Sequence, residues 1–278
     1  MKIQIKNEYS NLRTVIMAKV DGFSIKHPVN STQEYYYKTN PPQLQKMIKQ
    51  QNAFVEVIEN FGVEILWANI IQDSPCQVNT RDVAFAIDDS VYISSMKENI
   101  RKNEFIGIQP IMESVRKKVT LCGGSVEGGD VVIDGKKVFV GISQRTNDEG
   151  VQNLRDYLPK GCEVVPIYLK PNYLHLDTVF NIVSKNIALC CKNAVTDESC
   201  RELSSKYRIL DVSLSEQNTL ATNVLSITPA DIVADVRNSK TNKLLNKEGF
   251  NIHELDFSEI SKIGGSFRCS TCPLYRSG

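Results

Sequence analysis

The chain has 278 residues, of which 41% are hydrophobic, so it is long enough to bury a substantial core. Its 33 basic and 32 acidic residues leave a net charge of +1, which excludes a strong field attracting nucleic acid or an anionic membrane. No stretch reads as a signal peptide or a membrane span. We therefore expect a cytoplasmic protein that binds a small molecule but no nucleic acid or membrane, with the homo-oligomeric state left open.

Eight cysteines are too sparse and irregular for a disulfide framework, so most are expected to be packing residues. Cys269 and Cys272 have the spacing of a redox or zinc motif. A zinc site would need a second ligand pair, and a redox motif would need a following helix, whereas Pro273 comes next. We expect no metal and no cofactor.

The predicted elements repeat along the chain. A first set comprises strands at 2–6 and 12–20, a helix at 42–60 and a strand at 63–67. Four hairpins follow, which pair 83–87 with 90–94, 131–133 with 137–142, 179–183 with 187–191, and 224–228 with 232–235. Helical patterns trail them at 110–117, 147–158, 197–207 and 239–249, and most are followed by a short strand such as 163–167 or 208–212.

The repeating unit is therefore β-β-α-β, and five such units predict an α/β fold. Chemically interesting residues recur at nearly the same interval: Asp82, Glu127, His175, Asn223 and Cys269 are 45, 48, 48 and 46 positions apart. If the units pack around an axis, the residues that enter each hairpin converge at its centre. Residues distant in the sequence would then form one pocket.

Of the three histidines, His27 and His253 are expected at the surface or in packing, whereas His175 is a candidate for chemistry. Strand alternation would point His175 and Asp177 to the same face. A catalytic pair and a structural pair both fit this pattern.

Two glycine-rich segments carry further candidates. Glu127-Gly-Gly-Asp130 permits a close backbone approach at a site, or forms a simple bulge. Gly264 to Cys269 delivers a cysteine beside Arg268, whose charge would favour the thiolate. A buried spectator thiol is the alternative.

Three arginines lie near these segments. Arg81 beside Asp82 could form an ion pair at a strand start, and Arg101 and Arg145 follow their hairpins in polar stretches. Solvated arginines are the ordinary interpretation of the latter two.

Five motifs together resemble, in order, those of arginine deiminases, dimethylarginine dimethylaminohydrolases and amidinotransferases. They are Thr-Arg-Asp82, Glu127-Gly-Gly-Asp130, Ser-Gln-Arg145-Thr, His175-Leu-Asp177-Thr and Gly-Gly-Ser-Phe-Arg-Cys269-Ser-Thr-Cys-Pro. The resemblance implies the pentein fold, a five-bladed α/β propeller of β-β-α-β units with pseudo-fivefold symmetry. It also implies one catalytic domain over residues 1–278.

The resemblance also implies catalytic roles. Cys269 would attack the guanidinium carbon, and His175 would protonate the departing nitrogen and then activate water. Glu127 is similar to the residue that hydrogen-bonds both the substrate and His175.

Binding roles follow in the same way. Asp82 and Asp177 resemble the carboxylates that hold the guanidinium, and Arg145 resembles the arginine that binds the substrate carboxylate. Arg101 matches a second such arginine more weakly. Arg268 departs from the family pattern, since relatives usually carry histidine before the nucleophile.

The expected reaction is hydrolysis of the guanidino group of arginine or a close derivative, giving citrulline and ammonia. Amidino transfer to an amine, dimethylarginine hydrolysis and two-step hydrolysis to ornithine are the alternatives within the superfamily. A non-catalytic binding protein of the same fold is a further alternative, which the retained motif residues oppose.

Overall fold

The computed structural model describes residues 1–24 and 27–278. The strands are β1 (Asn11–Met17), β2 (Glu64–Trp67), β3 (Ala84–Ile87), β4 (Ser90–Ile93), β5 (Lys118–Thr120), β6 (Val131–Asp134), β7 (Lys137–Ile142), β8 (Glu163–Tyr168), β9 (Phe180–Ser184), β10 (Ile187–Cys190), β11 (Arg208–Asp211), β12 (Leu225–Ser226), β13 (Asp231–Asp235), β14 (Asn251–Leu255) and β15 (Cys272–Ser277).

The α-helices are α1 (Ser31–Thr39), α2 (Leu44–Asn60), α3 (Thr80–Val83), α4 (Glu104–Glu113), α5 (Asp148–Tyr157), α6 (Asp197–Lys206), α7 (Leu214–Gln217) and α8 (Ser239–Lys247). Short 3₁₀ turns are η1 (Val20–Gly22), η2 (Asn99–Arg101), η3 (Gly128–Asp130), η4 (Leu176–Thr178), η5 (Lys192–Ala194) and η6 (Ile260–Ile263). Among the described helices, none combines the length and apolar character needed to cross a bilayer.

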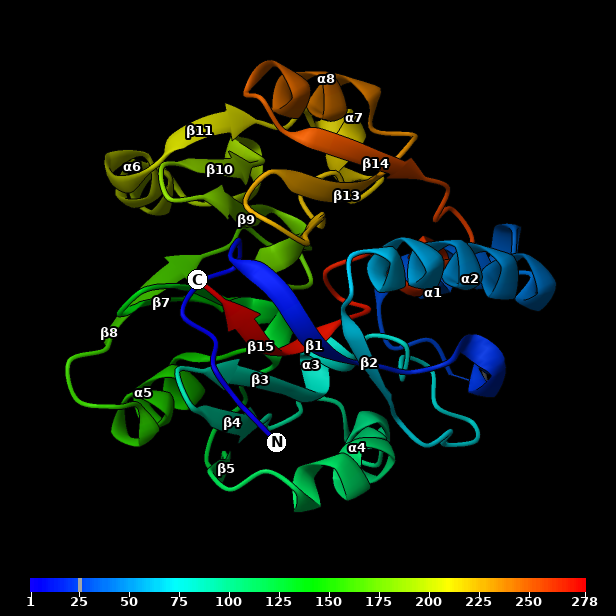
Figure 1. Ribbon diagram of the computed structural model, residues 1–278, viewed down its shortest axis with the longest axis horizontal. Helices are drawn as coiled ribbons and strands as arrows, with labels where there is room; N and C mark the ends of the chain where they lie inside the picture. Colours follow the sequence, from blue (N-terminus) through cyan, green and yellow to red (C-terminus); the bar gives the residue numbers. More distant parts are fainter. Residues whose placement is uncertain (25–26) are drawn as a thin grey trace.

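The described strands form five three-stranded sheets, β15-β1-β2, β3-β4-β5, β6-β7-β8, β9-β10-β11 and β12-β13-β14. In every sheet the middle strand pairs antiparallel with the first and parallel with the third. A parallel pair needs a crossover, and helices α2, α4, α5, α6 and α8 supply it. These helices lie at the periphery of the molecule, outside the sheets (Figure 1).

The predicted hairpins, and most of the predicted helices, are confirmed to within a few residues. Helix α2 shows the reason, because its buried apolar residues Met47, Phe54 and Ile58 recur at helical spacing along one face. The helix predicted at 110–117 is displaced, since α4 ends at Glu113 and contains Pro110 within it. Proline is common at a helix start, and this preference misplaced the prediction.

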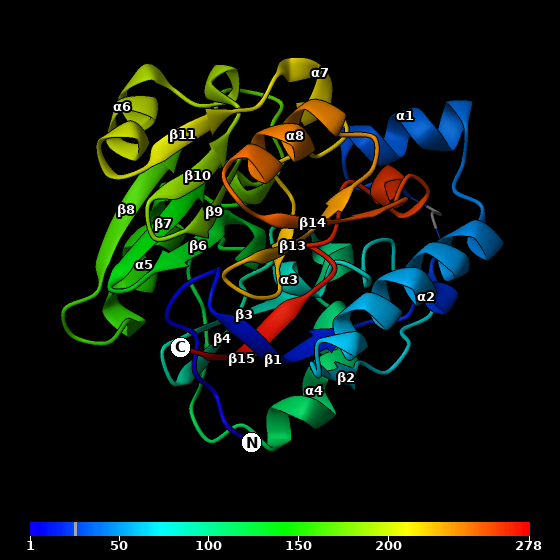
Figure 2. The same cartoon turned by 45° about the horizontal axis from the view of Figure 1, so that its top comes forward.

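The strand predicted at 2–6 is wrong. Gln4 and Ile5 make only isolated bridges, to Tyr275 and Asp88. The place of that strand is taken by β15, which pairs antiparallel with β1 along its whole length. Both views show β15 beside β1, so the C-terminal strand completes the sheet that the N-terminal strand begins (Figures 1 and 2).

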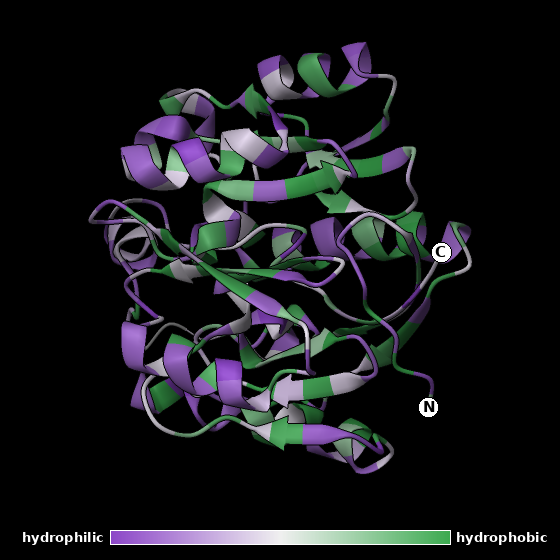
Figure 3. Ribbon diagram, turned by 90° about the vertical axis from the view of Figure 1, so that its left-hand side faces the viewer, coloured by the Kyte–Doolittle hydropathy of each residue, from purple (hydrophilic) through white to green (hydrophobic). Residues whose placement is uncertain are grey.

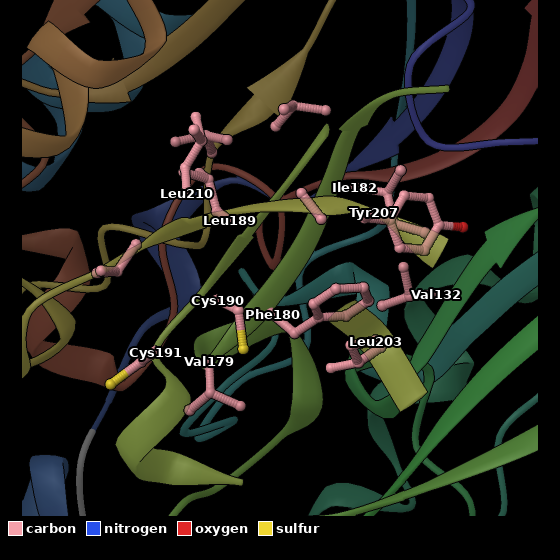
Figure 4. Close-up of a cluster of buried hydrophobic side chains, with 14 of the residues drawn as sticks. Val132, Val179, Phe180, Ile182, Leu189, Cys190, Cys191, Leu203, Tyr207 and Leu210 are labelled. Carbon is pink, nitrogen blue, oxygen red and sulfur yellow. The ribbon is translucent and has the colours of Figure 1, made fainter. Parts of the chain in front are cut away.

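Apolar side chains of the strands form three core clusters, and the strands carry more hydrophobic residues than the outer helices (Figure 3). The largest surrounds β9 and β10, where Phe180, Ile182 and Leu189 are fully buried (Figure 4). Cys190 and Cys191 belong to this cluster. All eight cysteines are free, which confirms that the chain has no disulfide framework.

Candidate active site

The five residues of nearly equal spacing all precede the first strand of a sheet. Asp82 lies in α3 before β3, Glu127 caps η3 before β6, and His175 caps η4 before β9. Asn223 stands just ahead of β12, and Cys269 just ahead of β15. Because the sheets share one topology, the same position in each repeat is brought to the same region of the molecule.

The Cys269 sulfur lies between an amide and a carboxylate. Asn223 Nδ2 donates to Sγ at 3.1 Å, and the thiol donates to Asp177 Oδ2 at 3.3 Å. Asn223 Oδ1 also accepts from the Cys269 backbone N–H at 3.1 Å, which fixes the cysteine backbone. Burial, together with the negative charges of Asp177 and Asp82, raises the pKa of Cys269 well above its ordinary value.

His175 is held by two carboxylates. Its Nε2 lies 2.9 Å from Glu127 Oε2, and its Nδ1 lies 3.6 Å from Asp82 Oδ1. Burial alone would lower its pKa, but Asp82, Asp130 and Glu127 raise the pKa of His175 to about 9. The imidazole is therefore protonated at neutral pH and can donate a proton.

Glu127 is ionised in the same network. Burial opposes its charge, but the hydrogen bond with His175 and the charge of Arg101 hold the pKa of Glu127 at about 2. Its other oxygen, Oε1, accepts from the Lys97 backbone N–H at 3.1 Å.

The glycines after Glu127 allow this close packing. A Cβ at Gly129 would stand 2.7 Å from Asp82 Oδ1 and 2.8 Å from the His175 ring. A Cβ at Gly128 would stand 2.1 Å from the Arg81 carbonyl oxygen. The expected close backbone approach is therefore present between two segments of the site.

Asp177 is brought beside Cys269, but not by strand alternation. The segment 176–178 is the 3₁₀ turn η4, so the predicted strand face does not exist there. The turn is stabilised by Thr178, whose hydroxyl donates to the His175 carbonyl at 2.7 Å.

Arg268 does not serve as the expected activator of the thiol. Its Nη1 donates to Asp177 Oδ2 at 2.8 Å and its Nη2 to Glu8 Oε1 at 2.9 Å. Two carboxylates thus balance its charge, and the pKa of Cys269 is raised in spite of it.

The two candidate carboxylate-binding arginines differ. Arg101 is enclosed by carboxylates: it donates to Glu104 at 2.8 and 3.1 Å, to Asp82 at 3.0 Å and to Glu127 at 3.4 Å. This geometry leaves Arg101 no free face for a substrate carboxylate. Arg145 is different, because its Nη2 donates to the Val29 carbonyl while its Nη1, 3.6 Å from Glu127 Oε1, makes no hydrogen bond to the described residues.

All seven predicted site residues are no more than 2% exposed: Asp82, Arg101, Glu127, Arg145, His175, Asp177 and Cys269. Three of their buried polar atoms lack a hydrogen-bond partner, namely Asp82 Oδ1, Asp177 Oδ1 and Arg145 Nη1. A buried polar atom without a partner is costly, so such atoms at a site mark where a ligand binds.

Asp82, Glu127 and His175 could also hold a metal ion, since one ligand atom of each lies within 4.8 Å of the others. Arg101 already brings a positive charge to this group through its bonds to Asp82 and Glu127. A second cation there would meet electrostatic repulsion, so the residues fit a metal poorly.

A cavity of about 330 Å³ adjoins this region. Leu174 and Thr178 line it, each one residue from a predicted site residue, as does Gly264 ahead of the cysteine loop.

Sequence reasoning missed Asn223 as a contact of the thiol, although its spacing singled it out. It also missed Glu8, which lies outside every motif and contacts Arg268 through the tertiary structure alone.

Comparisons with known proteins agree with this fold. The family model described as N,N dimethylarginine dimethylhydrolase, eukaryotic, matches residues 23–276. The uncharacterized protein YkgA of Bacillus subtilis is 38% identical over 276 residues, covering 99% of this chain and 96% of YkgA. The arginine deiminase of Listeria welshimeri is 29% identical over 247 residues, covering 71% of this chain and 61% of the deiminase.

Among solved structures, SxtG, an amidinotransferase from Microseira wollei in the saxitoxin biosynthetic pathway, superposes with a TM-score of 0.88 at 19% identity. The match covers 99% of this chain and 98% of SxtG, and it shows the shared mixed α/β fold. Fold and site together define a guanidino-modifying enzyme of the pentein superfamily. Within it, the chain belongs to the N,N dimethylarginine dimethylhydrolase family.

Proposed function

We propose that this protein hydrolyses the guanidino group of arginine or a close derivative, giving citrulline and ammonia. One observation carries the proposal: three buried polar atoms that make no hydrogen bond within the described residues complement an arginine-like ligand. Asp82 Oδ1 and Asp177 Oδ1 can accept from guanidinium N–H groups, and Arg145 Nη1 can donate to a carboxylate.

Binding of this cation would activate the nucleophile. Burial, together with the carboxylates of Asp177 and Asp82, raises the pKa of Cys269. A guanidinium between them neutralises their charge, so the thiol can release its proton to solvent only once the substrate is bound. The protein thus avoids carrying a reactive thiolate at rest.

Hydrolysis then takes two steps. The Cys269 thiolate attacks the guanidinium carbon, and the carbon–nitrogen bond breaks as protonated His175 donates its proton and ammonia leaves. The neutral imidazole next takes a proton from water, whose oxygen attacks the amidino-thioether carbon. The carbon–sulfur bond breaks and the remaining proton of the water oxygen goes to solvent, which releases citrulline and restores the thiolate.

Arg101 supports this chemistry by electrostatics. It is a fixed cation that keeps Asp82 and Glu127 in place, and we assign it this role instead of carboxylate binding.

A second candidate is hydrolysis of asymmetric dimethylarginine, which the family match favours. The unpartnered Asp177 oxygen opposes it, because a dimethylated nitrogen has no N–H to offer and the anion would stay unpaired. That costs about 1–3 kcal/mol, so arginine should be preferred by a factor of about 5 to 150. The fold shared with an amidinotransferase keeps transfer to an amine as a third candidate.

The test measures kcat/KM for arginine and asymmetric dimethylarginine side by side, with products identified by mass spectrometry and with an amine such as glycine added in a third assay. Citrulline formed faster from arginine supports the proposal. Faster turnover of the dimethylated compound would make dimethylarginine hydrolysis the function. Amidino transfer to the amine that is faster than citrulline formation would make the protein an amidinotransferase.

The nucleophile is tested by two matched variants. Cys269→Ser should abolish turnover, since a hydroxyl is a far weaker nucleophile at neutral pH than a thiolate. Cys272→Ser should retain most of it, because that buried thiol contacts only the Ala84 carbonyl as a hydrogen-bond partner. An acid quench of the native enzyme should trap an adduct on the peptide containing Cys269, and equal losses in both variants would contradict the assignment.

For the whole chain, we propose that the five sheets form one pseudo-fivefold propeller in a single catalytic domain over 1–278, in the cytoplasm. The common strand order of the sheets and the peripheral helices support this arrangement.

A further inference from the structure

A chain of buried charges runs from the N-terminal segment to the candidate nucleophile. Glu8 Oε1 accepts from Arg268 Nη2 at 2.9 Å, and Arg268 Nη1 donates to Asp177 Oδ2 at 2.8 Å. The same Asp177 oxygen accepts from the Cys269 thiol at 3.3 Å. Glu8, Arg268 and Asp177 are at most 5% exposed, so water screens these interactions weakly.

Three buried arginines act on the carboxylate of Glu8. Besides Arg268, its carboxylate lies 3.7 Å from Arg81 Nη2, and the charge of buried Arg276 also acts on it. Burial alone would raise its pKa, but these arginines hold the pKa of Glu8 at about 2. The residue is therefore an anion at any pH at which the protein would work.

The position of Arg268 depends on its three acceptors: Asp177, Glu8 and the Val131 carbonyl, the last at 2.8 Å. Only Asp177 and Glu8 are charged, and each accepts from a different Nη atom of the guanidinium. If the charge of Glu8 is removed, it no longer offsets the positive charge of Arg268. That positive charge then acts more strongly on Asp177 and on the nearby sulfur.

We propose that Glu8 is a positioning residue of the active site, which acts through Arg268. It balances the charge of Arg268, so that Asp177 stays available to a cationic substrate and the thiol of Cys269 stays protonated at rest. The catalytic part of this role rests on the proposed function. The electrostatic effect of Glu8 on Cys269 does not depend on it.

The sign of the effect follows from the groups that face the thiol. Asp177 and Asp82 favour the protonated thiol, and Arg268 favours the thiolate. Removing the negative charge of Glu8 strengthens the influence of Arg268 and lowers the thiol pKa. Removing Arg268 has the opposite effect.

The test is the rate of alkylation of Cys269 by iodoacetamide without substrate, followed by peptide mass spectrometry between pH 7 and 10. Exposed Cys122 reports the activity of the reagent, and buried Cys272 reports opening of the structure. Relative to Cys272, Glu8→Gln should accelerate alkylation of Cys269 about tenfold at a fixed pH, which is a fall of about one pH unit in its pKa. Arg268→Gln should slow it, and Glu8→Asp, which keeps the charge, should match the native protein.

Opposite shifts in the two glutamine variants are a result that general loosening of the structure cannot produce. Equal rates in Glu8→Gln and the native protein, or shifts of the same sign in both variants, would overturn the proposal. If Glu8→Gln fails to fold by circular dichroism, the double variant Glu8→Gln/Arg276→Gln, which removes one charge of each sign, takes its place under the same criteria.

Steady-state kinetics add a second readout. Glu8→Gln should raise KM for arginine severalfold more than it changes kcat, because Arg268 then competes with the substrate for Asp177, and Glu8→Asp should restore KM. An unchanged KM would contradict the positioning role. If the native protein turns over no guanidino compound, the proposed function fails while the alkylation test of Glu8 still stands.

Discussion

Ionisable side chains at the site control one another at the scale of single residues. Burial opposes the charge on His175, but the surrounding carboxylates outweigh it and keep the imidazole protonated. For Cys269, burial and the nearby carboxylates act in the same direction and keep the thiol protonated. The buried carboxylates of Asp82 and Asp177 close to the Cys269 thiol therefore offer acceptors for a cation.

The raised pKa of His175 predicts the alkaline limit of activity. Above about pH 9 the imidazole loses the proton that the leaving nitrogen needs, so kcat/KM should fall. The same shift stabilises the fold: the contribution is complete below the ordinary pKa of 6.5 and is lost as pH rises through about 9. A pH profile of kcat/KM tests the alkaline limit of activity. Urea unfolding at pH 6 and 9.5 tests the loss of stability. Activity that stays constant to pH 10 would contradict the role of His175, and His253→Gln serves as the control.

Arg145 predicts how the substrate carboxylate is recognised. Arg145→Ala should lower kcat/KM for arginine, chiefly through KM, because the substrate carboxylate loses a charged partner. The loss corresponds to about 2–4 kcal/mol of transition-state stabilisation. Agmatine, which lacks that carboxylate, should be a poor substrate, and Arg145→Ala should leave its kcat/KM unchanged. Exposed Arg155→Ala is the matched control. Native turnover of agmatine equal to that of arginine would show that Arg145 has another role.

At the scale of elements, short turns ahead of the first strands carry the chemistry. Turn η4 replaces the strand that alternation predicts at His175 and Asp177, while turn η3 and helix α3 stand at the matching places before β6 and β3. A 3₁₀ turn places consecutive side chains around the backbone, so His175 can face Glu127 while Asp177 faces the thiol.

Gly129 tests the close packing of these turns. In Gly129→Ala the new methyl group would meet Asp82 and His175, and overpacking of this kind costs about 1–3 kcal/mol. We expect this loss of stability to be accompanied by a fall in kcat/KM of about tenfold or more. Gly135→Asn is the control, because that hairpin turn is open and asparagine tolerates its φ of 62°. Full activity of Gly129→Ala would mean that η3 can move away freely.

At the scale of the whole molecule, β15 links the two ends of the chain. It pairs with β1 and also follows the Cys269 loop, so the sheet that joins the ends also anchors the candidate nucleophile. Leu274 in this strand is fully buried in the core cluster shared with β3, β4 and β6.

Leu274→Ala should therefore destabilise the protein by about 2–5 kcal/mol through loss of burial and the cavity it leaves. Chemical denaturation would measure this, with Leu214→Ala, at an exposed position, as the control. A cost below about 1 kcal/mol for Leu274→Ala would mean that β15 is dispensable to the core.

The sequence by itself determined the β-β-α-β repeat, the hairpins and the common spacing of Asp82, Glu127, His175, Asn223 and Cys269, because period, turn residues and spacing are local properties of the chain. The tertiary structure alone decided which strand pairs with β1, since the ladder joins residues more than 250 positions apart. It also decided that Arg101 faces carboxylates and that Glu8 balances Arg268. The partner of a buried charge depends on which segments the fold brings within a few ångströms, and a single sequence carries no local signal of that distance.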